Sequence, residues 1–450
     1  MGFRLSQRGL VLWFAALGVV SACRHTTPGV GQPIAPSLAV ATFDSAWRII
    51  RDTHFDTTFN GVDWSAVRTE LRPRAERARS TEELREVIRG MLARLRQSHF
   101  DIFPAEAFSP RGDSTLSALG DVGLTLRLID GMMLVEHVSG SAERAGVRPG
   151  WIVRRIGDYV VADSVKHFSR SRYARLPGAT PDLVAAAQFH GAVGSSVRTE
   201  FVDGAGGAVT RDLAREQQPG EPVKFGHLPM LMTHFESRVE ARRTDWPSLG
   251  VIRFNFWMLP VVIRLDKAID SLRGVDGIII DLRENPGGYA ATISGVAGHF
   301  LEERLSLGTL RARASETHLL ANPRVVTNDG RRVKPYAGPV AILIGPHSAS
   351  ASEVFASGMQ AIGRARVFGE RSQGGVLPAI ADKLPNGDAL YHAVGDFVTP
   401  NGDRVEGRGV IPDETARPTR AALLAGHDPA FDAAVRWITA ERSRRSSSRP

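Results

Sequence analysis

A serine-rich turn between a strand and a helix is the part of the sequence best suited to nucleophilic chemistry. In the segment Gly345–Gln360 an apolar strand ends, small residues form a tight turn, and a helix begins near Ala351. A serine at that junction lies beside the N–H groups and the positive dipole end of the helix. Those donors can stabilise the oxyanion that forms when a hydroxyl attacks a carbonyl carbon. On local sequence alone, however, Ser350 and Glu353 favour a simpler role, the capping box that starts a helix.

Two adjacent glycines are the second candidate feature. The segment Asp281–Tyr289 directly follows an apolar strand and contains Gly287 and Gly288 after a proline. Adjacent glycines allow backbone N–H groups to approach a ligand closely, so either residue could supply an oxyanion donor. Taken alone, a Pro-Gly-Gly sequence usually indicates only a turn.

The order of four segments along the chain resembles the carboxyl-terminal-processing serine protease family, whose catalytic core is shared with the tricorn protease. In chain order these segments are Asp281–Gly288, Ser348–Glu353, Gly369–Gly375 and Val405–Asp413. The resemblance implies a serine endopeptidase that cleaves polypeptides through an acyl-enzyme. It assigns the nucleophile to Ser350, and the oxyanion hole to the amide of Ala351 together with that of Gly287 or Gly288.

The same resemblance indicates the general base, because the family has two branches. One branch uses a lysine some two dozen residues after the nucleophile, where this chain has Gly374 and Gly375, and the nearest later lysine lies beyond the motif. The tricorn-like branch instead uses a histidine that follows a serine in the N-terminal region, and a glutamate just before a Gly-Val-x-Pro-Asp element. Ser98, His99 and Glu406 match those positions. Glu406 is therefore expected to orient His99 through the hydroxyl of Ser98.

Two other interpretations of the histidines stay open. A neutral imidazole, with an ordinary pKa of about 6.5, can accept the Ser350 proton near neutral pH, but His99 also fits a histidine buried in an apolar strand. His347 lies three residues before Ser350 and is a weak rival base. The backbone geometry of the turn is expected to point its side chain away.

The region from about residue 116 to 212 resembles a PDZ domain. It changes to short strands with glycine-rich turns, and the segment Gly123, Leu124, Thr125 and Leu126 opens the first strand. In PDZ domains the loop before this strand binds the terminal carboxylate of a peptide, and the strand pairs with the peptide. Trp151 departs from the aspartate usual after the preceding glycine. The alternative is a small β domain used for packing alone.

The N-terminus has the pattern of an export signal. Two arginines precede the apolar run Gly9–Val20, which is too short to span a membrane but suits a secretion signal. The run ends in Ser21, Ala22 and Cys23, which resembles a lipoprotein processing site that leaves Cys23 acylated. We therefore expect a periplasm-facing protein of the bacterial cell envelope, anchored to the membrane by lipid. An ordinary signal peptide with an incidental cysteine is the alternative.

The expected fold is a multidomain α+β protein with an N-terminal helical region, a PDZ-like β domain and an α/β protease core of the crotonase/ClpP-like spiral type. Residues 213–248 are expected to be a polar connection. The expected divisions are a signal peptide (1–22), a tether (23–40), the helical region with Ser98 and His99 (41–112), the PDZ-like domain (113–215), the core (216–438) and a disordered tail (439–450).

Composition excludes several other classes of function. The 56 Lys and Arg residues exceed the 48 Asp and Glu residues by eight, but the arginines mostly alternate with acids, which indicates a solvated surface. No nucleic-acid partner is therefore expected. A single cysteine excludes an internal disulfide framework. The histidines show no metal-ligand spacing, so neither a metal nor another cofactor is expected. The rival from another class is a catalytically inactive, peptide-binding lipoprotein scaffold.

Overall fold

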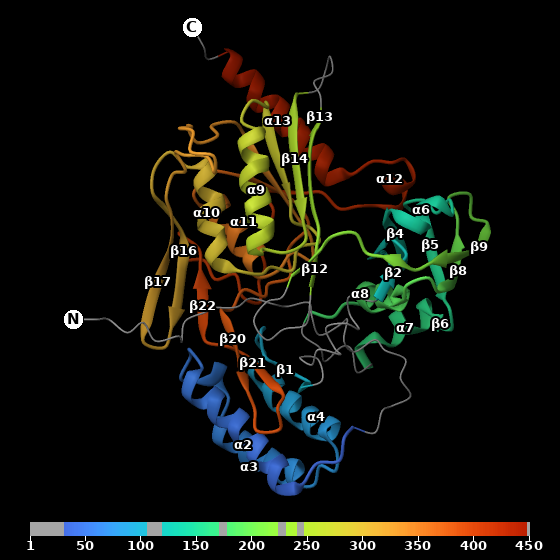
Figure 1. Cartoon of the computed structure of the whole chain (residues 1–450), viewed down its shortest axis with the longest axis vertical. Helices are drawn as coiled ribbons and strands as arrows, with labels where there is room; N and C mark the ends of the chain where they lie inside the picture. Colours follow the sequence, from blue (N-terminus) through green and yellow to red (C-terminus); the bar gives the residue numbers. More distant parts are fainter. Residues whose placement is uncertain (1–30, 106–118, 171–177, 224–230, 241–246, 448–450) are drawn as a thin grey trace.

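The computed structural model describes residues 31–105, 119–170, 178–223, 231–240 and 247–447. The expected lipidation residue, Cys23, lies outside these ranges. Figure 1 shows the N-terminal helices at the bottom, a β domain on the right and the large α/β core above. None of the helices in the described ranges combines the length and apolarity needed to cross a membrane.

Three helices form the N-terminal unit. They are α2 (Pro36–Thr53), α3 (Trp64–Glu76) and α4 (Thr81–Leu92). Helix α4 begins where Ser80 Oγ accepts a hydrogen bond from the N–H of Glu83. Helix α2 begins at Pro36, inside the segment expected to be a tether, because its apolar residues Ala39 and Phe43 are fully buried in the core of this unit. Burial of this apolar face stabilises a helix that starts earlier in the chain than expected.

The N-terminal unit is joined to the α/β core by a strand pair. Strand β1 (Asp101–Phe103) pairs antiparallel with β21 (Ala389–Ala393), and β21 also pairs with β20 (Ala379–Lys383). The apolar cluster of the helices includes Leu377, Leu384 and Leu390 from this hairpin. The chain just before β1 is therefore held against the core.

The β domain has its own apolar core, in which Trp151 is buried. Its main sheet has the order β3 (Leu124–Ile129), β4 (Met132–Val138), β5 (Ile152–Ile156), β8 (Ser196–Val202) and β9 (Ala208–Ala214), with β6 (Tyr159–Val160) beside β5. A small sheet contains β10 (Glu216–Gln217), β2 (Leu119–Asp121) and β7 (Gly191–Ala192). Its α-helices are α6 (Gly140–Arg144), α7 (Val161–His167) and α8 (Pro181–Ala186).

A six-stranded sheet forms the centre of the α/β core. Its order is β13 (Phe235–Glu240), β14 (Leu249–Phe254), β15 (Gly277–Asp281), β18 (Val340–Ile344), β19 (Arg366–Gly369) and β23 (Glu414–Thr415). Only the first pair is antiparallel. Helices cover both faces, so β15 and β18 are buried throughout.

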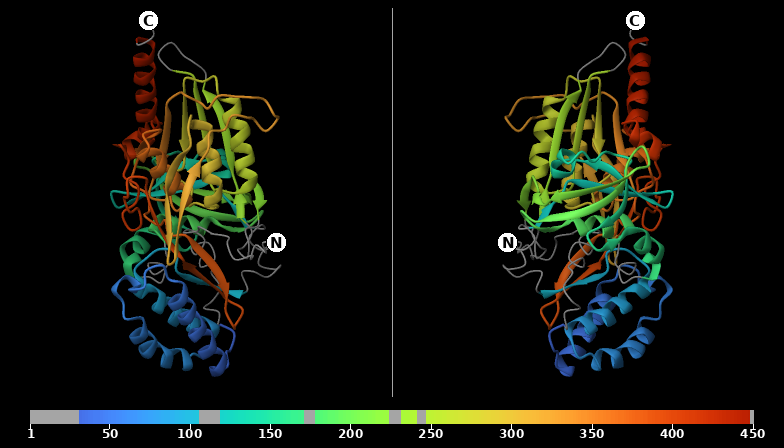
Figure 2. Two further views of the ribbon diagram at one scale, coloured as in Figure 1. Left: turned by 90° about the vertical axis from the view of Figure 1, so that its left-hand side faces the viewer. Right: turned by 90° about the vertical axis from the view of Figure 1, so that its right-hand side faces the viewer.

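The helices and the second sheet of the core complete the layers in Figures 1 and 2. One face of the main sheet packs against α9 (Leu259–Ser271), α10 (Ile293–Ala297) and α11 (Ala351–Ala361), and the other packs against α13 (Pro429–Ser447). The second sheet has the order β17 (Ser315–Ala321), β16 (Leu305–Ala312) and β22 (Gly395–Val398). The remaining elements are the pair β11 (Glu221–Val223) and β12 (Leu231–Thr233), and helix α12 (Arg420–Leu424).

Two further expectations about chain segments are wrong. Strand β13 lies within the residues expected to be a polar connection, because pairing with β14 satisfies its backbone hydrogen bonds despite its polar side chains. Helix α13 continues to Ser447, into the tail expected to be disordered. Its residue Ile438 is fully buried against the main sheet, and this contact supports the helix beyond the position where the sequence becomes polar.

Candidate active site

Ser350 lies at the corner between strand β18 and helix α11 in a sparsely populated backbone conformation. Its φ is 58° and its ψ is −120°, values that a residue with a side chain adopts only when the surroundings enforce them. Its N–H donates to the carbonyl oxygen of Gly375 at 2.8 Å and to Oε2 of Glu353 at 3.0 Å. Its Oγ is buried and has no hydrogen-bond partner among the residues that the structure describes.

The expected capping box is therefore formed only in the half that involves the Ser350 backbone. Ser350 occupies the N-cap position of α11, and the Glu353 carboxylate accepts the Ser350 N–H. The Ser350 hydroxyl does not cap the helix by a hydrogen bond, in contrast to Ser80 at the start of α4. An unused, buried hydroxyl at a helix N-terminus is available for chemistry.

The loop with Gly287 and Gly288 packs directly against this corner. A Cβ at Gly287 would lie 2.6 Å from Cβ of Ser350 and 3.0 Å from the nitrogen of Ala351, so only glycine fits there. The backbone N–H of Gly287 is already donated to Oδ1 of Asn285 at 2.9 Å. The family resemblance assigns the second oxyanion donor to the amide of either Gly287 or Gly288. Of these two, the Gly288 amide is the one that makes no hydrogen bond within the described chain.

Trp257 holds this glycine loop in place. Its backbone N–H donates to the carbonyl oxygen of Gly287 at 2.9 Å, and its carbonyl accepts the N–H of Tyr289 at 2.7 Å. Its indole Nε1 donates to Oγ of Ser352, in the first turn of α11, at 3.0 Å. The backbone of Trp257 therefore holds the loop, and its fully buried side chain holds the helix start. Sequence reasoning missed this role because Trp257 has the pattern of an ordinary core residue.

A hydrogen-bonded chain of Glu406, Ser98 and His99 brings together two distant segments. Ser98 Oγ donates to Glu406 Oε2 at 2.9 Å and lies 2.6 Å from His99 Nδ1. The other oxygen of Glu406 accepts the backbone N–H of Ser98 at 2.8 Å. Because the hydroxyl proton is used toward Glu406, the hydroxyl accepts from Nδ1–H, and this leaves the lone pair of His99 on Nε2.

Burial sets the protonation states of this chain. His99 is 2% exposed, and desolvation lowers its pKa to about 3, so the imidazole is neutral at neutral pH. Burial also raises the pKa of Glu406, against the opposing effect of hydrogen bonds from Ser98 and from the N–H of Val376. His99 has a φ of 63°, so it shares with Ser350 a left-handed backbone that local sequence does not favour.

Gly375 lies between the serine corner and the histidine. Its carbonyl accepts the N–H of Ser350, and a Cβ there would lie 3.4 Å from Cβ of Ser98 and 3.7 Å from Cε1 of His99. This is one of the two glycines found where the other branch of the resembling family has its lysine. In this chain the space next to that position holds Ser98 and His99.

His347 faces away from the serine corner toward the β domain. Its Nε2 lies 3.3 Å from a carboxylate oxygen of Asp182 in α8, and its Nδ1 lies 3.2 Å from one of Glu284. Burial alone would lower the pKa of His347, but the two carboxylates raise it to about 10. A protonated imidazole has no lone pair, so His347 is unsuited to act as a base.

The residues expected to bind peptide line a cavity of about 560 Å³ at the junction of the β domain and the core. Gly123, Leu124, Thr125 and Leu126 lie on one side of it, and Leu183 of α8 is also part of its lining. His347 and Arg253 reach the same cavity from the core. The cavity thus connects strand β3 with the segment that leads to Ser350.

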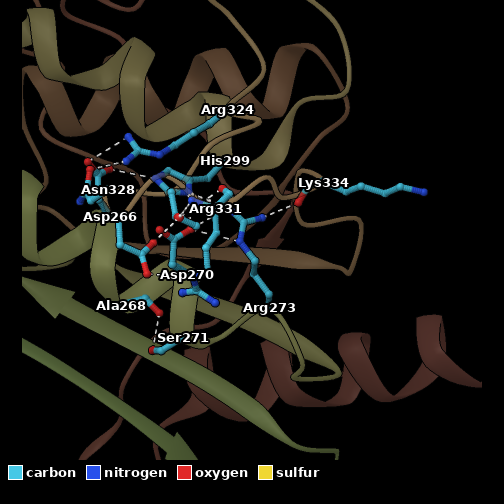
Figure 3. Close-up of polar contacts among 12 residues, drawn as sticks. Asp266, Ala268, Asp270, Ser271, Arg273, His299, Arg324, Asn328, Arg331 and Lys334 are labelled. Atoms are coloured by element: carbon cyan, nitrogen blue, oxygen red, sulfur yellow. Dashed lines mark hydrogen bonds and ion pairs between the residues drawn. The ribbon is translucent and has the colours of Figure 1, made fainter.

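A separate polar cluster links α9 to the loop after β17 (Figure 3). His299 is fully buried and its Nε2 lies 2.9 Å from Oδ1 of Asp266, while Arg324 and Arg273 pair with Asp266 and Asp270. These arginines balance the acids, so the cluster is a structural network. Within the described ranges no group of three or more His, Cys, Asp or Glu residues is arranged to hold a metal ion.

Known proteins are similar to this chain in sequence and fold. Residues 248–416 match peptidase family S41, and residues 41–93 match the Tricorn protease C1 domain. A carboxyl-terminal-processing protease of Synechocystis is 25% identical over 404 residues, which cover 88% of this chain and 85% of that protein. The chloroplastic carboxyl-terminal-processing peptidase 2 of Arabidopsis thaliana is 26% identical over 385 residues, covering 82% and 67%.

Solved structures show the same fold. The photosystem II D1 C-terminal processing protease superposes with a TM-score of 0.57 at 21% identity, over 89% of this chain and 97% of that one. Mature CPAF superposes with a TM-score of 0.58 at 12% identity, over 90% and 97%.

Proposed function

The chain belongs to the carboxyl-terminal-processing serine proteases of peptidase family S41, and on this premise we propose that Ser350 is its nucleophile and His99 its general base. The observation that carries this assignment is the chain of Glu406, Ser98 and His99, which ends beside Gly375, the residue that also holds the Ser350 N–H. The alternative base, His347, is held protonated by two carboxylates.

The reaction follows from these positions. Ser350 Oγ attacks the carbonyl carbon of the scissile peptide bond, and its proton passes to Nε2 of His99. The oxyanion accepts hydrogen bonds from the N–H groups of Ala351 and Gly288. His99 then gives the proton to the leaving amine as the C–N bond breaks. Water, deprotonated by His99, hydrolyses the acyl-enzyme and restores Ser350.

Glu406 acts through Ser98 rather than on His99 directly. The negative carboxylate polarises the Ser98 hydroxyl, whose oxygen in turn stabilises the charge that develops on the imidazolium. The fixed Nδ1–H···Oγ contact also keeps Nε2 as the proton acceptor. Burial makes this assistance necessary, because desolvation by itself opposes a charged His99.

The β domain is proposed to bind polypeptide ends and to gate the protease. The cavity beside Gly123–Leu126 lies along β3, the edge strand of its sheet, and an edge strand can pair with a bound peptide. The next residue of β3, Arg127, pairs with Glu370 of the core, which follows β19 directly.

The export pattern and Cys23 support the proposal of a lipid-anchored protein in the bacterial cell envelope. Radiolabelled palmitate should label the wild type but not Cys23→Ala in a bacterial host.

A fluorophosphonate probe tests the catalytic assignment directly. We expect covalent labelling of the wild-type chain, located at Ser350 by mass spectrometry of its peptides, and cleavage of a casein substrate. Ser350→Ala should lose both signals while it keeps its fold by circular dichroism. A wild-type chain that binds peptides but neither labels nor cleaves would instead establish the inactive scaffold.

A further inference from the structure

Glu353 accepts four hydrogen bonds in a fully buried position beside the nucleophile. Its Oε2 accepts the backbone N–H groups of Ser350 at 3.0 Å and Gly375 at 2.9 Å. Its Oε1 accepts the N–H of Gly374 at 2.6 Å and the hydroxyl of Ser372 at 2.5 Å. The side chain is 0% exposed, so these donors replace water as its solvation.

The four donors belong to the segments that build the active site. The carbonyl of Gly375 also accepts a hydrogen bond from the N–H of Ser350, so both residues are held to each other and to the same carboxylate oxygen. Ser372 Oγ accepts the N–H of Val410 at 2.6 Å. Val410 lies four residues after Glu406. One network therefore links the serine corner, the segment of Gly374 and Gly375, and the segment that carries Glu406.

No Arg, Lys or His forms an ion pair with Glu353 in the described part of the chain. Burial raises the pKa of Glu353 to about 7, and the hydrogen bonds are the groups that favour its charged form. Loss of any one donor therefore destabilises the charged carboxylate. Loss of the carboxylate in turn removes a hydrogen-bond acceptor from each of these buried donors. A buried polar network of this kind is rigid only when it is fully satisfied.

We infer that Glu353 is a positioning residue for the proposed reaction. It keeps Ser350 in its left-handed backbone conformation and keeps Gly375 between Ser350 and His99. It does not line the cavity at the β domain, so its loss should slow the chemical step and leave binding of a probe or substrate nearly unchanged. The inference rests on the proposed roles of Ser350 and His99.

The variant Glu353→Gln isolates this role because it keeps size and shape. Whichever carboxylate oxygen becomes the amide NH₂ group, that group faces two donors: the Ser350 and Gly375 N–H groups on one side, or the Gly374 N–H and the Ser372 hydroxyl on the other. An amide NH₂ cannot accept a hydrogen bond. At least one buried backbone N–H therefore loses its acceptor in either orientation.

Asp388 provides a matched control. Its carboxylate is also 0% exposed and accepts hydrogen bonds from two nitrogens of Arg85 at 2.9 and 2.7 Å, from the N–H of Ala105 at 2.9 Å and from Asn386 Nδ2 at 2.7 Å. It lies between the N-terminal helices and the core hairpin. Asp388→Asn should therefore lower the melting temperature by a general loss of buried hydrogen bonds without a selective effect on catalysis.

The experiment measures fluorophosphonate labelling of the full chain over a range of probe concentrations. For Glu353→Gln we expect the maximal labelling rate to fall by about 10²-fold, as for a misplaced reacting group, while the half-saturating probe concentration changes less than about threefold. Asp388→Asn should keep both parameters within about threefold. In casein cleavage, Glu353→Gln should likewise lower kcat by about 10²-fold and change KM by less than about threefold.

Several results would overturn the inference. A folded Glu353→Gln chain with a maximal rate within threefold of wild type, or an equal loss in Asp388→Asn, contradicts a positioning role. If Glu353→Gln does not fold, Ser372→Ala decides the question, with a loss of at least tenfold expected and near wild-type labelling contradicting it. Absence of labelling in the wild type would instead refute the proposed function, and the inference with it.

Discussion

His99 and His347 both lie in segments that reach the serine corner, and their surroundings make them chemically opposite. His99 comes from the N-terminal unit, contacts a hydroxyl, and has a pKa lowered by burial to about 3. His347 is three residues from Ser350 in the chain, contacts two carboxylates, and has a pKa raised by them to about 10. Closeness in sequence therefore does not identify the base. The charge and solvation around each ring do.

The most direct test of which histidine acts as the base is to replace each one in turn. We expect His99→Ala to abolish casein cleavage, a loss of at least about 10³-fold, because the proposed base is lost and His347 is held protonated by its two carboxylates. His347→Gln should retain labelling at Ser350 within about tenfold. Measured rates with the opposite order would assign the base to His347 and refute the proposal.

The second test removes the support of His99 and keeps the ring. Glu406→Gln should lower kcat by about 10²- to 10³-fold, because the imidazolium loses the negative charge relayed by Ser98. KM for casein should change little. As a control, Asp396→Asn removes a carboxylate that pairs with Arg404 near the same segment, and its kcat should stay near the wild-type value.

The third test concerns stability at alkaline pH. The pKa of His347 is raised from an ordinary 6.5 to about 10, so its contribution to stability is complete below pH 6.5 and is lost as pH rises toward 10. His347→Gln should destabilise the chain at pH 6.5 by about 3 kcal/mol, since it breaks a buried ion pair. The difference from wild type should shrink at pH 10. Urea unfolding at both pH values measures it, and a constant difference would contradict the raised pKa.

The fourth test concerns the effect of His99 on stability at acidic pH. The pKa of His99 is lowered from 6.5 to about 3, so the unfolded chain binds one more proton in this window. This residue therefore makes the unfolding free energy rise with pH between 3 and 6.5, by up to about 1.4 kcal/mol per pH unit. His99→Gln should show a shallower rise than wild type in urea unfolding between pH 4 and 6.5. Equal slopes would show that His99 is not buried in its neutral form.

The smallest effect is expected at the glycine between the two catalytic groups. A Cβ at Gly375 meets Ser98 and His99 at ordinary contact distances of 3.4 Å or more, and its φ is not in the left-handed region. Gly375→Ala should therefore lower kcat by less than about threefold. Gly287→Ala is the contrasting variant, because its Cβ would come within 2.6 Å of Ser350. Similar activity of the two variants would contradict the geometry of the corner.

The local elements and the order of the motifs could be predicted from sequence patterns. The apolar strand before Ser350, the helix after it and the cap of α4 depend on neighbouring residues, so pattern and capping rules identify them. Family resemblance then selected His99 from a distant segment. Position along the chain could not show its environment, because desolvation depends on which segments pack around the ring.

Which polar groups form hydrogen bonds, and which stay available for chemistry, depends on how distant segments pack together. The Gly287 amide donates to Asn285, and Glu353 holds the Ser350 backbone while the Ser350 hydroxyl finds no hydrogen-bond partner among the described residues. Strand β13 and the end of helix α13 form where the polar sequence predicted a connection and a tail. Each of these outcomes depends on contacts with other segments. Hydrogen bonding and burial are properties of the packed chain, and local sequence patterns do not contain them.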